Sequence, residues 1–185
     1  MKLFFYDLET TGTMYWKNGI HQISGCIDID GELKESFNFK VAPNPNALID
    51  PVALEIGNVT EDQIKAYPDM KTVYKQIVKT LKQYVNKFDR SDKFFLVGYN
   101  NRGFDDNFFR AFFVQNDDPY FGSWFYADSH DALVLASRKL ASERTQLENF
   151  KLKTVCKYVG IEVDETRLHD AAYDIDLTRQ LYYKI

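Results

Sequence analysis

Cysteine and histidine are scarce in this sequence of 185 residues, which contains 2 cysteines and 3 histidines. Cys26 and Cys156 lie far apart without a C-x-x-C partner, which argues against a zinc site or a disulfide framework and predicts two reduced thiols. No stretch approaches the roughly 20 apolar residues of a membrane helix. Acids interrupt the first apolar run at Asp7 and Glu9, before the core of a signal peptide could form. We therefore expect a soluble, cytoplasmic protein that does not associate with membranes.

Excess positive charge is also missing. The sequence has 23 Lys and Arg residues against 27 Asp and Glu residues, a formal net charge of -4. This balance argues against a protein that binds nucleic acid through bulk positive potential. Any site for phosphate groups therefore needs another source of positive charge.

The spacing of apolar residues predicts an α/β domain with a mixed sheet. Segments rich in aromatic and β-branched residues predict strands, and two of them are joined by a turn at Asp30-Gly31. Strand and helix patterns then alternate, which is typical of a layered α/β domain. The expected strands are 2–6, 21–30, 33–41, 93–98 and 123–127, and the expected helices are 70–88, 104–113, 129–141, 147–159 and 170–183. Because no linker interrupts the chain, we expect one domain over residues 1–185.

Two acids follow the first predicted strand in the segment Asp7-Leu8-Glu9-Thr10-Thr11-Gly12. In an extended strand, residues i and i+2 face the same side about 6.6 Å apart. Asp7 and Glu9 can therefore converge on one hard cation. An exposed strand end that carries two acids explains the pair equally well when it is taken alone.

Two further segments supply acids that can join this pair. Asp105 opens a predicted helix directly after a buried strand, although the helix dipole alone also favours an acid there. Near the other end of the sequence, Asp170 can cap a helix whose second turn presents Asp174, whereas Asp176 should face solvent. Four carboxylates brought together would repel one another unless cations neutralise them, and two Mg²⁺ ions would do so. The ions would also supply the positive charge that the side chains lack.

These three segments resemble the three motifs of the DEDD 3′–5′ exonuclease superfamily, which includes exonuclease I and polymerase proofreading domains. The resemblance implies a ribonuclease-H-like fold, a mixed five-stranded sheet flanked by helices. It also implies two Mg²⁺ ions, for which Mn²⁺ can substitute. The implied metal ligands are Asp7, Glu9, Asp105 and Asp174.

The spacing within the last motif resembles the histidine branch of this superfamily. That branch places a histidine five residues before the last aspartate, the position of His169 before Asp174. Five residues of an α-helix turn through about 500°, so we expect His169 in the loop before the helix. The resemblance implies that His169 is the general base. The other histidines, His21 and His130, match no motif and are expected to be structural or exposed.

The same resemblance suggests residues that contact the terminal nucleotide. They are Leu8, Thr10, Thr11, Gly12, Asn100 and Phe104. For Leu8 and Phe104, a place in the hydrophobic core is the competing interpretation. The isoleucine-threonine segment near the substrate's end, where many members carry a histidine, is matched here by Ile56-Gly57-Asn58-Val59-Thr60 without that histidine.

The resemblance therefore implies a metal-dependent enzyme that removes nucleoside 5′-monophosphates from the 3′ end of a single strand. DNA and RNA stay open as substrates, because recognition of a 2′-hydroxyl depends on the geometry of the pocket. The expected partners are single-stranded 3′ ends and a polymerase or another repair or replication protein, with the oligomeric state open. Two alternatives are an endonuclease of the same fold, against which the spacing of His169 argues, and a nucleic-acid-binding module that has lost catalysis.

Overall fold

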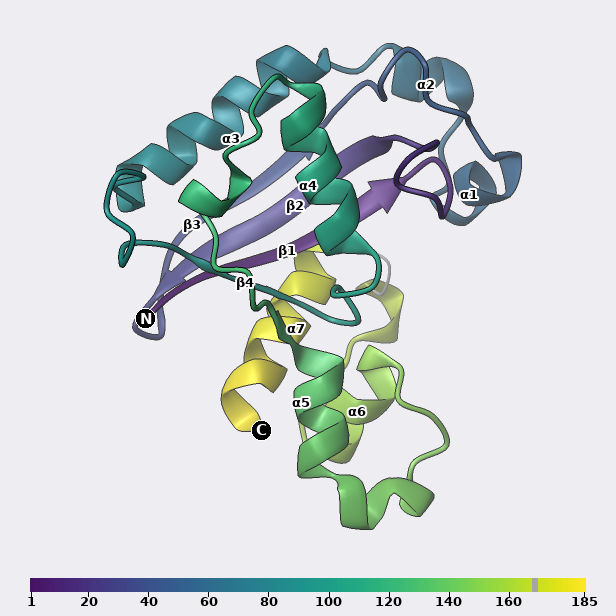
Figure 1. Cartoon of the computed structure of the whole chain (residues 1–185). Helices are drawn as coiled ribbons and strands as arrows, with labels where there is room; N and C mark the ends of the chain where they lie inside the picture. Colours follow the sequence, from purple (N-terminus) through teal and green to yellow (C-terminus); the bar gives the residue numbers. More distant parts are fainter. Residues whose placement is uncertain (168–169) are drawn as a thin grey trace.

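A five-stranded mixed sheet forms the centre of the computed structural model, which describes residues 1–167 and 170–185 (Figure 1). The strand order is β3-β2-β1-β4-β5. The strands are β1 (Lys2–Thr10), β2 (Ile20–Ile29), β3 (Glu32–Lys40), β4 (Phe95–Gly98) and β5 (His130–Asp131). The first three strands pair antiparallel, whereas β4 runs parallel to β1 and β5 runs parallel to β4. The predicted mixed sheet of five strands flanked by helices is confirmed.

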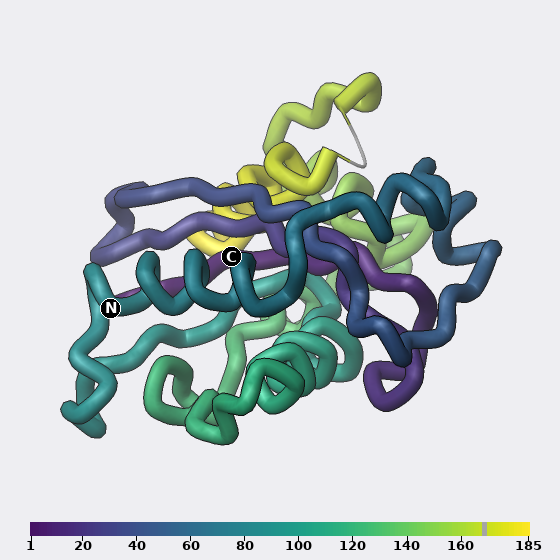
Figure 2. Tube along the Cα trace, turned by 90° about the horizontal axis from the view of Figure 1, so that it is seen from above, coloured from purple at the N-terminus to yellow at the C-terminus, as the bar shows by residue number. Residues whose placement is uncertain are grey.

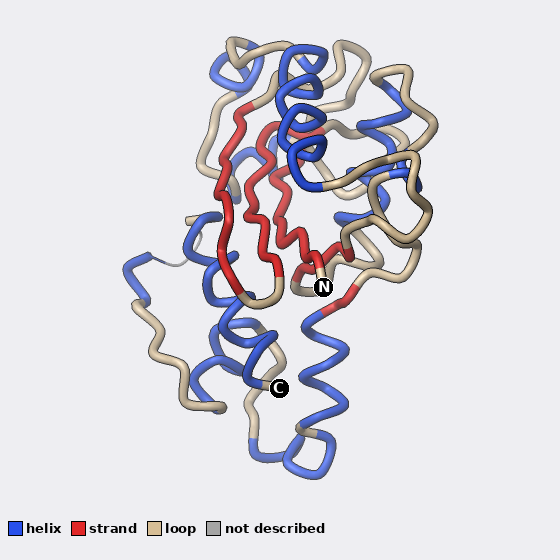
Figure 3. Tube along the Cα trace, turned by 90° about the vertical axis from the view of Figure 1, so that its left-hand side faces the viewer, coloured by secondary structure: helices blue, strands red, loops and turns tan. Residues whose placement is uncertain are grey.

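Helices cover both faces of this sheet (Figures 2 and 3). The α-helices are α1 (Pro51–Ile56), α2 (Glu61–Lys65), α3 (Met70–Tyr84), α4 (Asp105–Gln115), α5 (Ala132–Lys139), α6 (Leu152–Tyr158) and α7 (Ala171–Lys184). Short 3₁₀ helices span Phe121–Ser123, Ala141–Gln146 and Glu165–Arg167. None of the helices in the described part of the chain has the length and apolarity that a membrane span requires.

Alternation along β1 divides its side chains between two hydrophobic layers. Phe4 and Leu8 belong to the large core under α3 and α4, which contains most of the buried phenylalanines. Leu3 and Phe5 point to the opposite face and pack with Ile175 of α7. The two layers explain why β1 reads as a nearly continuous apolar run, because both of its faces are buried.

The turn predicted at Asp30-Gly31 joins β2 to β3. Asp30 has φ 54° and Gly31 has φ 87°, the left-handed conformation that a tight hairpin of this twist requires. The carboxylate of Asp28 accepts a hydrogen bond from the Gly31 backbone N–H at 2.8 Å. The predicted position of the turn is confirmed.

The strand predicted at residues 123–127 is wrong. Phe121–Ser123 forms a 3₁₀ turn, and Phe125 makes a single bridge with Phe94. Trp124 and Phe125 are buried in the core under α4. Their side chains fill this core, and their backbone does not continue as a strand. The fifth strand is the pair His130–Asp131, and Asp131 also caps α5.

A buried ion pair fixes α7 against the sheet. Asp28 of β2 has 0% of its surface exposed, and its carboxylate accepts a hydrogen bond from Arg179 Nε at 2.8 Å and from the Tyr183 hydroxyl at 2.7 Å. Arg179 Nη2 also donates to the Gly31 carbonyl at 2.9 Å. These contacts tie the second half of α7 to the hairpin between β2 and β3.

Removing this ion pair should destabilise the fold. Arg179→Ala leaves a buried carboxylate without its cation, which we expect to cost about 3 kcal/mol of unfolding free energy. Urea denaturation measures this loss. The exposed Arg138 in the last turn of α5 provides the control, because Arg138→Ala should change the unfolding free energy by less than about 0.5 kcal/mol. Equal losses in both variants would contradict this account of α7.

Candidate active site

The acids of β1 lie on the face of the sheet that packs against α7. Phe5 and Asp7 are paired with Cys26 and Ser24 of β2, and Glu9 is paired with Gln22. Phe5 and Cys26 contact α7, so alternation places Asp7 and Glu9 on that same face. The strand continues to Thr10, which keeps both acids inside the sheet and not beyond its end.

Asp105 reaches the same region from α4. It is the first residue of that helix, which begins after the turn that follows β4, and 7% of its surface is exposed. Gly98 ends β4 close to β1, since a Cβ atom there would lie 3.2 Å from the Tyr6 carbonyl oxygen. The close approach of the two strands carries the chain to the carboxyl end of β1, where α4 begins.

Asp174 reaches the region from α7. Asp170 caps this helix by accepting hydrogen bonds from the backbone N–H groups of Ala172 at 2.9 Å and Tyr173 at 3.4 Å. The predicted cap is therefore confirmed. Asp174 lies four residues beyond the cap, close enough to Asp7 to act on its ionisation, while Asp176 is exposed as expected.

The four predicted metal ligands form one electrostatically linked group, called the acidic cluster below: Asp7, Glu9, Asp105 and Asp174. Burial raises the pKa of Asp7 to about 7, and the charges of Glu9 and Asp174 add to the rise. Burial also raises the pKa of Asp105 well above its usual range, with a further contribution from Asp7. The structure thus places Glu9, Asp105 and Asp174 within electrostatic reach of Asp7, while their role as metal ligands stays a prediction.

The chemistry of the acidic cluster fits hard divalent cations. Its donors are all carboxylate oxygens, which Mg²⁺ and Mn²⁺ prefer. Mutual repulsion raises the cost of ionising the acids, and a bound cation would remove that cost. In the described residues, no three or more His, Cys, Asp or Glu side chains are close enough together to coordinate one metal ion. The acids would therefore have to move towards a cation in order to bind it.

Asp106 has a role that the sequence analysis missed. Its carboxylate accepts hydrogen bonds from the Tyr6 hydroxyl, from Asn101 Nδ2 at 2.9 Å and from Ser129 Oγ at 2.5 Å. Successive residues of a helix point about 100° apart, so one acid of the pair faces the cluster while the other faces Tyr6. Asp106 therefore anchors the first turn of α4 and holds Asp105 in place. Two consecutive acids at a helix start were the available signal.

The residues predicted to contact substrate have different surroundings. Thr11 has 0% of its surface exposed, and its hydroxyl donates to the Leu48 carbonyl at 2.8 Å. Gly12 packs so closely on Asn18 that a Cβ atom would lie 2.4 Å from that side chain. Both residues therefore shape the loop after β1.

The remaining residues of that set divide between core and surface. Leu8 lies in the core under α4, the competing position given for it above, and Phe104 is half-buried against the same core. Thr10 is partly exposed, and its hydroxyl donates to the Gly12 carbonyl at 2.8 Å. Asn100 is exposed in a left-handed conformation, φ 63°, fixed by a 2.9 Å hydrogen bond from its N–H to Asp131 Oδ1. Thr10, Asn100 and Phe104 thus remain accessible to a ligand.

The predicted general base, His169, lies outside the described residues, next to the cap residue Asp170. The other two histidines are structural, as expected. His21 has 1% of its surface exposed, and burial lowers its pKa to about 4. His130 stacks between Phe95 and Tyr182, with ring centroids 4.6 and 5.8 Å away.

The raised pKa of Asp7 predicts a pH-dependent stability of the metal-free protein. A carboxyl group whose pKa is higher in the folded state contributes stability that is complete below its unfolded pKa and is lost as the pH rises through its folded pKa. For Asp7 that loss should run from about pH 4 to about pH 7. His21 acts in the opposite direction between about pH 4 and 6.5, so the wild-type profile alone does not isolate Asp7.

The comparison with Asp7→Asn isolates this contribution. In chelator, the unfolding free energy of the wild type minus that of Asp7→Asn should fall by on the order of 1 kcal/mol per pH unit between pH 5 and pH 7, then level off. Denaturant titrations of both proteins across this range measure the difference. A difference that does not change with pH would show that Asp7 ionises normally.

Comparisons with known proteins agree with this geometry. The RNase_T family model, described as Exonuclease, matches residues 4–182. Exodeoxyribonuclease I of Escherichia coli is 28% identical over 94% of this chain, and ribonuclease T of Photobacterium profundum is 26% identical over 97% of it. The crystal structure of E. coli exonuclease I in complex with a dT13 oligonucleotide superposes on 98% of this chain with a TM-score of 0.76 and 26% identity.

These relatives differ in how much of their own length is matched. The chain spans 38% of exodeoxyribonuclease I and 40% of the chain in the dT13 complex, but 79% of ribonuclease T. It also matches 11% of the PolC-type DNA polymerase III of Oceanobacillus iheyensis, at 24% identity. The family model covers nearly the whole chain, and the four acids expected from the sequence form the acidic cluster. The chain therefore belongs to the exonuclease family that this model describes, the DEDD superfamily.

Proposed function

We propose that this domain hydrolyses single-stranded DNA or RNA from the 3′ end and releases nucleoside 5′-monophosphates. The observation that carries the proposal is that the acids of β1 face α7, which carries Asp174, while Asp105 opens α4 beyond the neighbouring strand, on a fold of the exonuclease family. Single-stranded substrates are supported by the dT13 oligonucleotide in the structure of E. coli exonuclease I. Because one of the relatives is a ribonuclease, ribonuclease T, the proposal includes RNA as well as DNA.

The acidic cluster would hold two divalent cations. Bound there, they would activate the attacking water and stabilise the leaving oxygen of the phosphodiester. Asp7 would be shared between the two sites, with Glu9 and Asp174 on the side of the attacking water. Asp105 would serve the second site, and the hydrogen bonds to Asp106 would fix its orientation.

His169 would take the proton from the attacking water. The water's oxygen would bond to phosphorus in line with the leaving 3′ oxygen, the bond between phosphorus and that oxygen would break, and the leaving oxygen would take up a proton from solvent. The released mononucleotide keeps its 5′-phosphate, and the shortened strand gains a free 3′-hydroxyl. Only a neutral imidazole can accept the proton, which makes this step sensitive to pH.

End-labelled DNA and RNA strands of matched sequence test this function with Mg²⁺, with Mn²⁺ and with chelator. We expect 5′-mononucleotides from the 3′ end in either metal, none in chelator, and a strong delay when a 3′-phosphate blocks the end. Circular single strands cut as fast as linear ones would favour the endonuclease alternative. Binding without cleavage in both metals would favour the non-catalytic module.

A further inference from the structure

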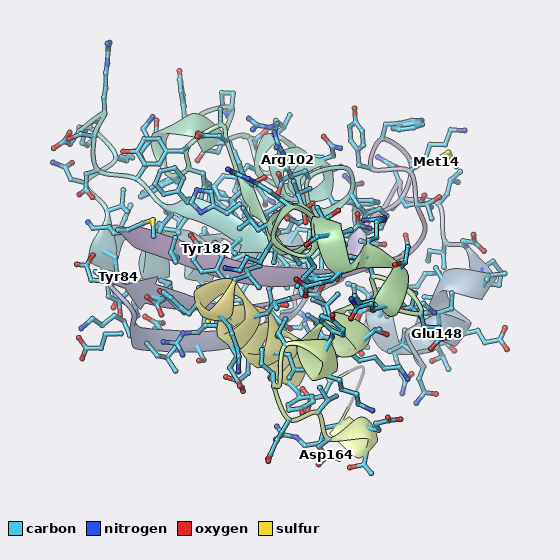
Figure 4. The ribbon with its side chains drawn as sticks, turned by 90° about the horizontal axis from the view of Figure 1, so that it is seen from below. Met14, Tyr84, Arg102, Glu148, Asp164 and Tyr182 are labelled. Carbon is cyan, nitrogen blue, oxygen red and sulfur yellow. The ribbon has the colours of Figure 1, made fainter. Side chains whose placement is uncertain are left out.

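Three large apolar residues stand exposed on the loop that follows β1. Met14, Tyr15 and Trp16 have 36%, 40% and 65% of their surfaces exposed. Figure 4 labels Met14 on this loop and Arg102 on the turn before α4. Consecutive exposed side chains of this size are costly in water and typically mark a binding surface. Residues 13–17 are called the aromatic loop below.

The aromatic loop is held in one conformation by hydrogen bonds. The backbone N–H groups of Lys17 and Asn18 donate to the Met14 carbonyl at 2.9 and 2.8 Å. The Asn18 side chain accepts from the Met14 N–H at 2.9 Å and donates to the Leu48 carbonyl at 2.8 Å. Because the loop is already ordered, binding to its rings would cost little conformational entropy.

A row of aromatic rings connects this loop to the acidic cluster. Phe104 directly precedes Asp105 in the chain, and its ring lies 4.9 Å from that of Phe108. The Tyr15 ring lies 6.5 Å from the Phe108 ring and meets the Trp16 ring edge-on at 5.0 Å. The aromatic loop therefore lies along α4, from Phe108 near the start of this helix, which Asp105 opens, to Gln115 at its end.

The surroundings of Trp16 suit a nucleotide. A hollow of about 100 Å³ beside it is lined by Lys17, Asn18 and Ala47 and by three further residues with amide side chains, Asn44, Asn46 and Gln115. Amides can pair with the edges of bases, a lysine can meet a phosphate, and an exposed ring can stack on any base. Arg102, on the turn before α4, adds a second exposed cation near the same helix.

We infer that the aromatic loop is a stacking platform for a base of the single strand upstream of its 3′-terminal nucleotide, with Trp16 as the principal ring. The inference rests on the proposed function for the identity of the strand. It adds a second contact, outside the acidic cluster, that selects strands longer than the terminal nucleotides. Dinucleotides would end before they reach it.

Binding is measured with Ca²⁺ in place of Mg²⁺, so that the readout does not depend on hydrolysis. Trp16→Ala should weaken the affinity for an eight-nucleotide strand on the order of 10-fold and change that for a dinucleotide by less than about 2-fold. Trp16→Phe should restore most of the lost affinity. Phe88 provides a matched control, because it is 87% exposed in the loop after α3, so Phe88→Ala should bind like the wild type.

A scan with single abasic sites locates the stacked base. At one position of the strand, removing the base should weaken the affinity of the wild type but should not change the affinity of Trp16→Ala. The base removal and the substitution delete the same contact, so their effects do not add. Tryptophan fluorescence gives an independent readout, since the sequence has 2 tryptophans and Trp124 is buried. The strand should quench the wild type, and Trp16→Phe should lose that quenching.

The failure of this inference is distinguishable from failure of the proposed function. Hydrolysis in Mg²⁺ with unchanged affinity in Trp16→Ala would overturn the platform alone. Position-specific quenching without hydrolysis in Mg²⁺ would uphold the platform and overturn the nuclease. If Trp16→Ala instead converts a dimer to a monomer while leaving strand affinity unchanged, the loop contacts a second copy of the chain and the platform is wrong.

Discussion

Asp7→Asn should lower the hydrolytic turnover by at least about 10³-fold, because it removes the carboxylate proposed to serve both cations. Metal ions contribute several kcal/mol of transition-state stabilisation, and each 1.4 kcal/mol corresponds to about a tenfold change in rate. The protein should still fold, because removing one carboxylate from the acidic cluster reduces the electrostatic repulsion in the metal-free protein. Turnover at saturating substrate, together with Mg²⁺ titration by calorimetry, measures both the rate and the lost metal affinity.

The last helix offers a matched pair of acids for the same experiment. Asp174→Asn removes a member of the acidic cluster, while Asp176→Asn removes an exposed acid two residues further along α7. Both changes remove one negative charge from α7, so the two variants have the same net charge. We expect turnover to collapse in the first variant and to stay within about 2-fold of the wild type in the second. Undiminished turnover in Asp7→Asn, or in chelator, would overturn the two-metal scheme.

His169→Ala should lower turnover at neutral pH by about 10²–10⁴-fold, the usual cost of losing a general base. Metal and substrate affinity should change little, because the acidic cluster stays intact. The reference pKa of histidine is about 6.5, so the wild-type rate should fall on the acidic side as the imidazole becomes protonated. The midpoint depends on the opposing effects of nearby carboxylates and bound cations.

Single-turnover rates against pH at saturating Mg²⁺ provide the measurement for His169. Raising the pH should partly rescue His169→Ala, because hydroxide becomes available without the base. His130→Asn is the control, since His130 is stacked between aromatic rings and should leave the shape of the pH profile unchanged. Parallel profiles of similar height for the wild type and His169→Ala would reject His169 as the base.

The acids were predictable from sequence because their chemistry depends on local geometry. Alternation in a strand and the start of a helix are short-range properties, so Asp7, Glu9 and Asp105 could be placed by counting residues. The superfamily resemblance then identified these three acids and Asp174 as the ligands of one pair of metal ions. Asp106 escaped because its three donors, Tyr6, Asn101 and Ser129, come from separate segments that only the folded chain brings together.

The difference between local sequence patterns and contacts formed only in the folded chain also explains the errors in the predicted fold. Residues 123–127 have the composition of a strand, but the large core under α4 uses Trp124 and Phe125 as fillers. The strand β5 has two residues, too few to produce a period. Helices α1 and α2 are also short, although Asp50 and the reciprocal hydrogen bonds between Thr60 and Gln63 mark their starts. Whether such short helices and strands form depends on tertiary packing, which the periodicity of apolar residues in the sequence does not show.

The order in which the acidic cluster is assembled has a consequence for synthesis of the protein. Asp7 and Glu9 leave the ribosome before Asp105, and Asp174 follows only with α7, which must then dock through Arg179 onto the hairpin of β2 and β3. Domains emerge N-terminus first during translation. A nascent chain that has not yet docked α7 therefore lacks a complete acidic cluster, so the activity proposed for this domain should begin only after α7 has docked.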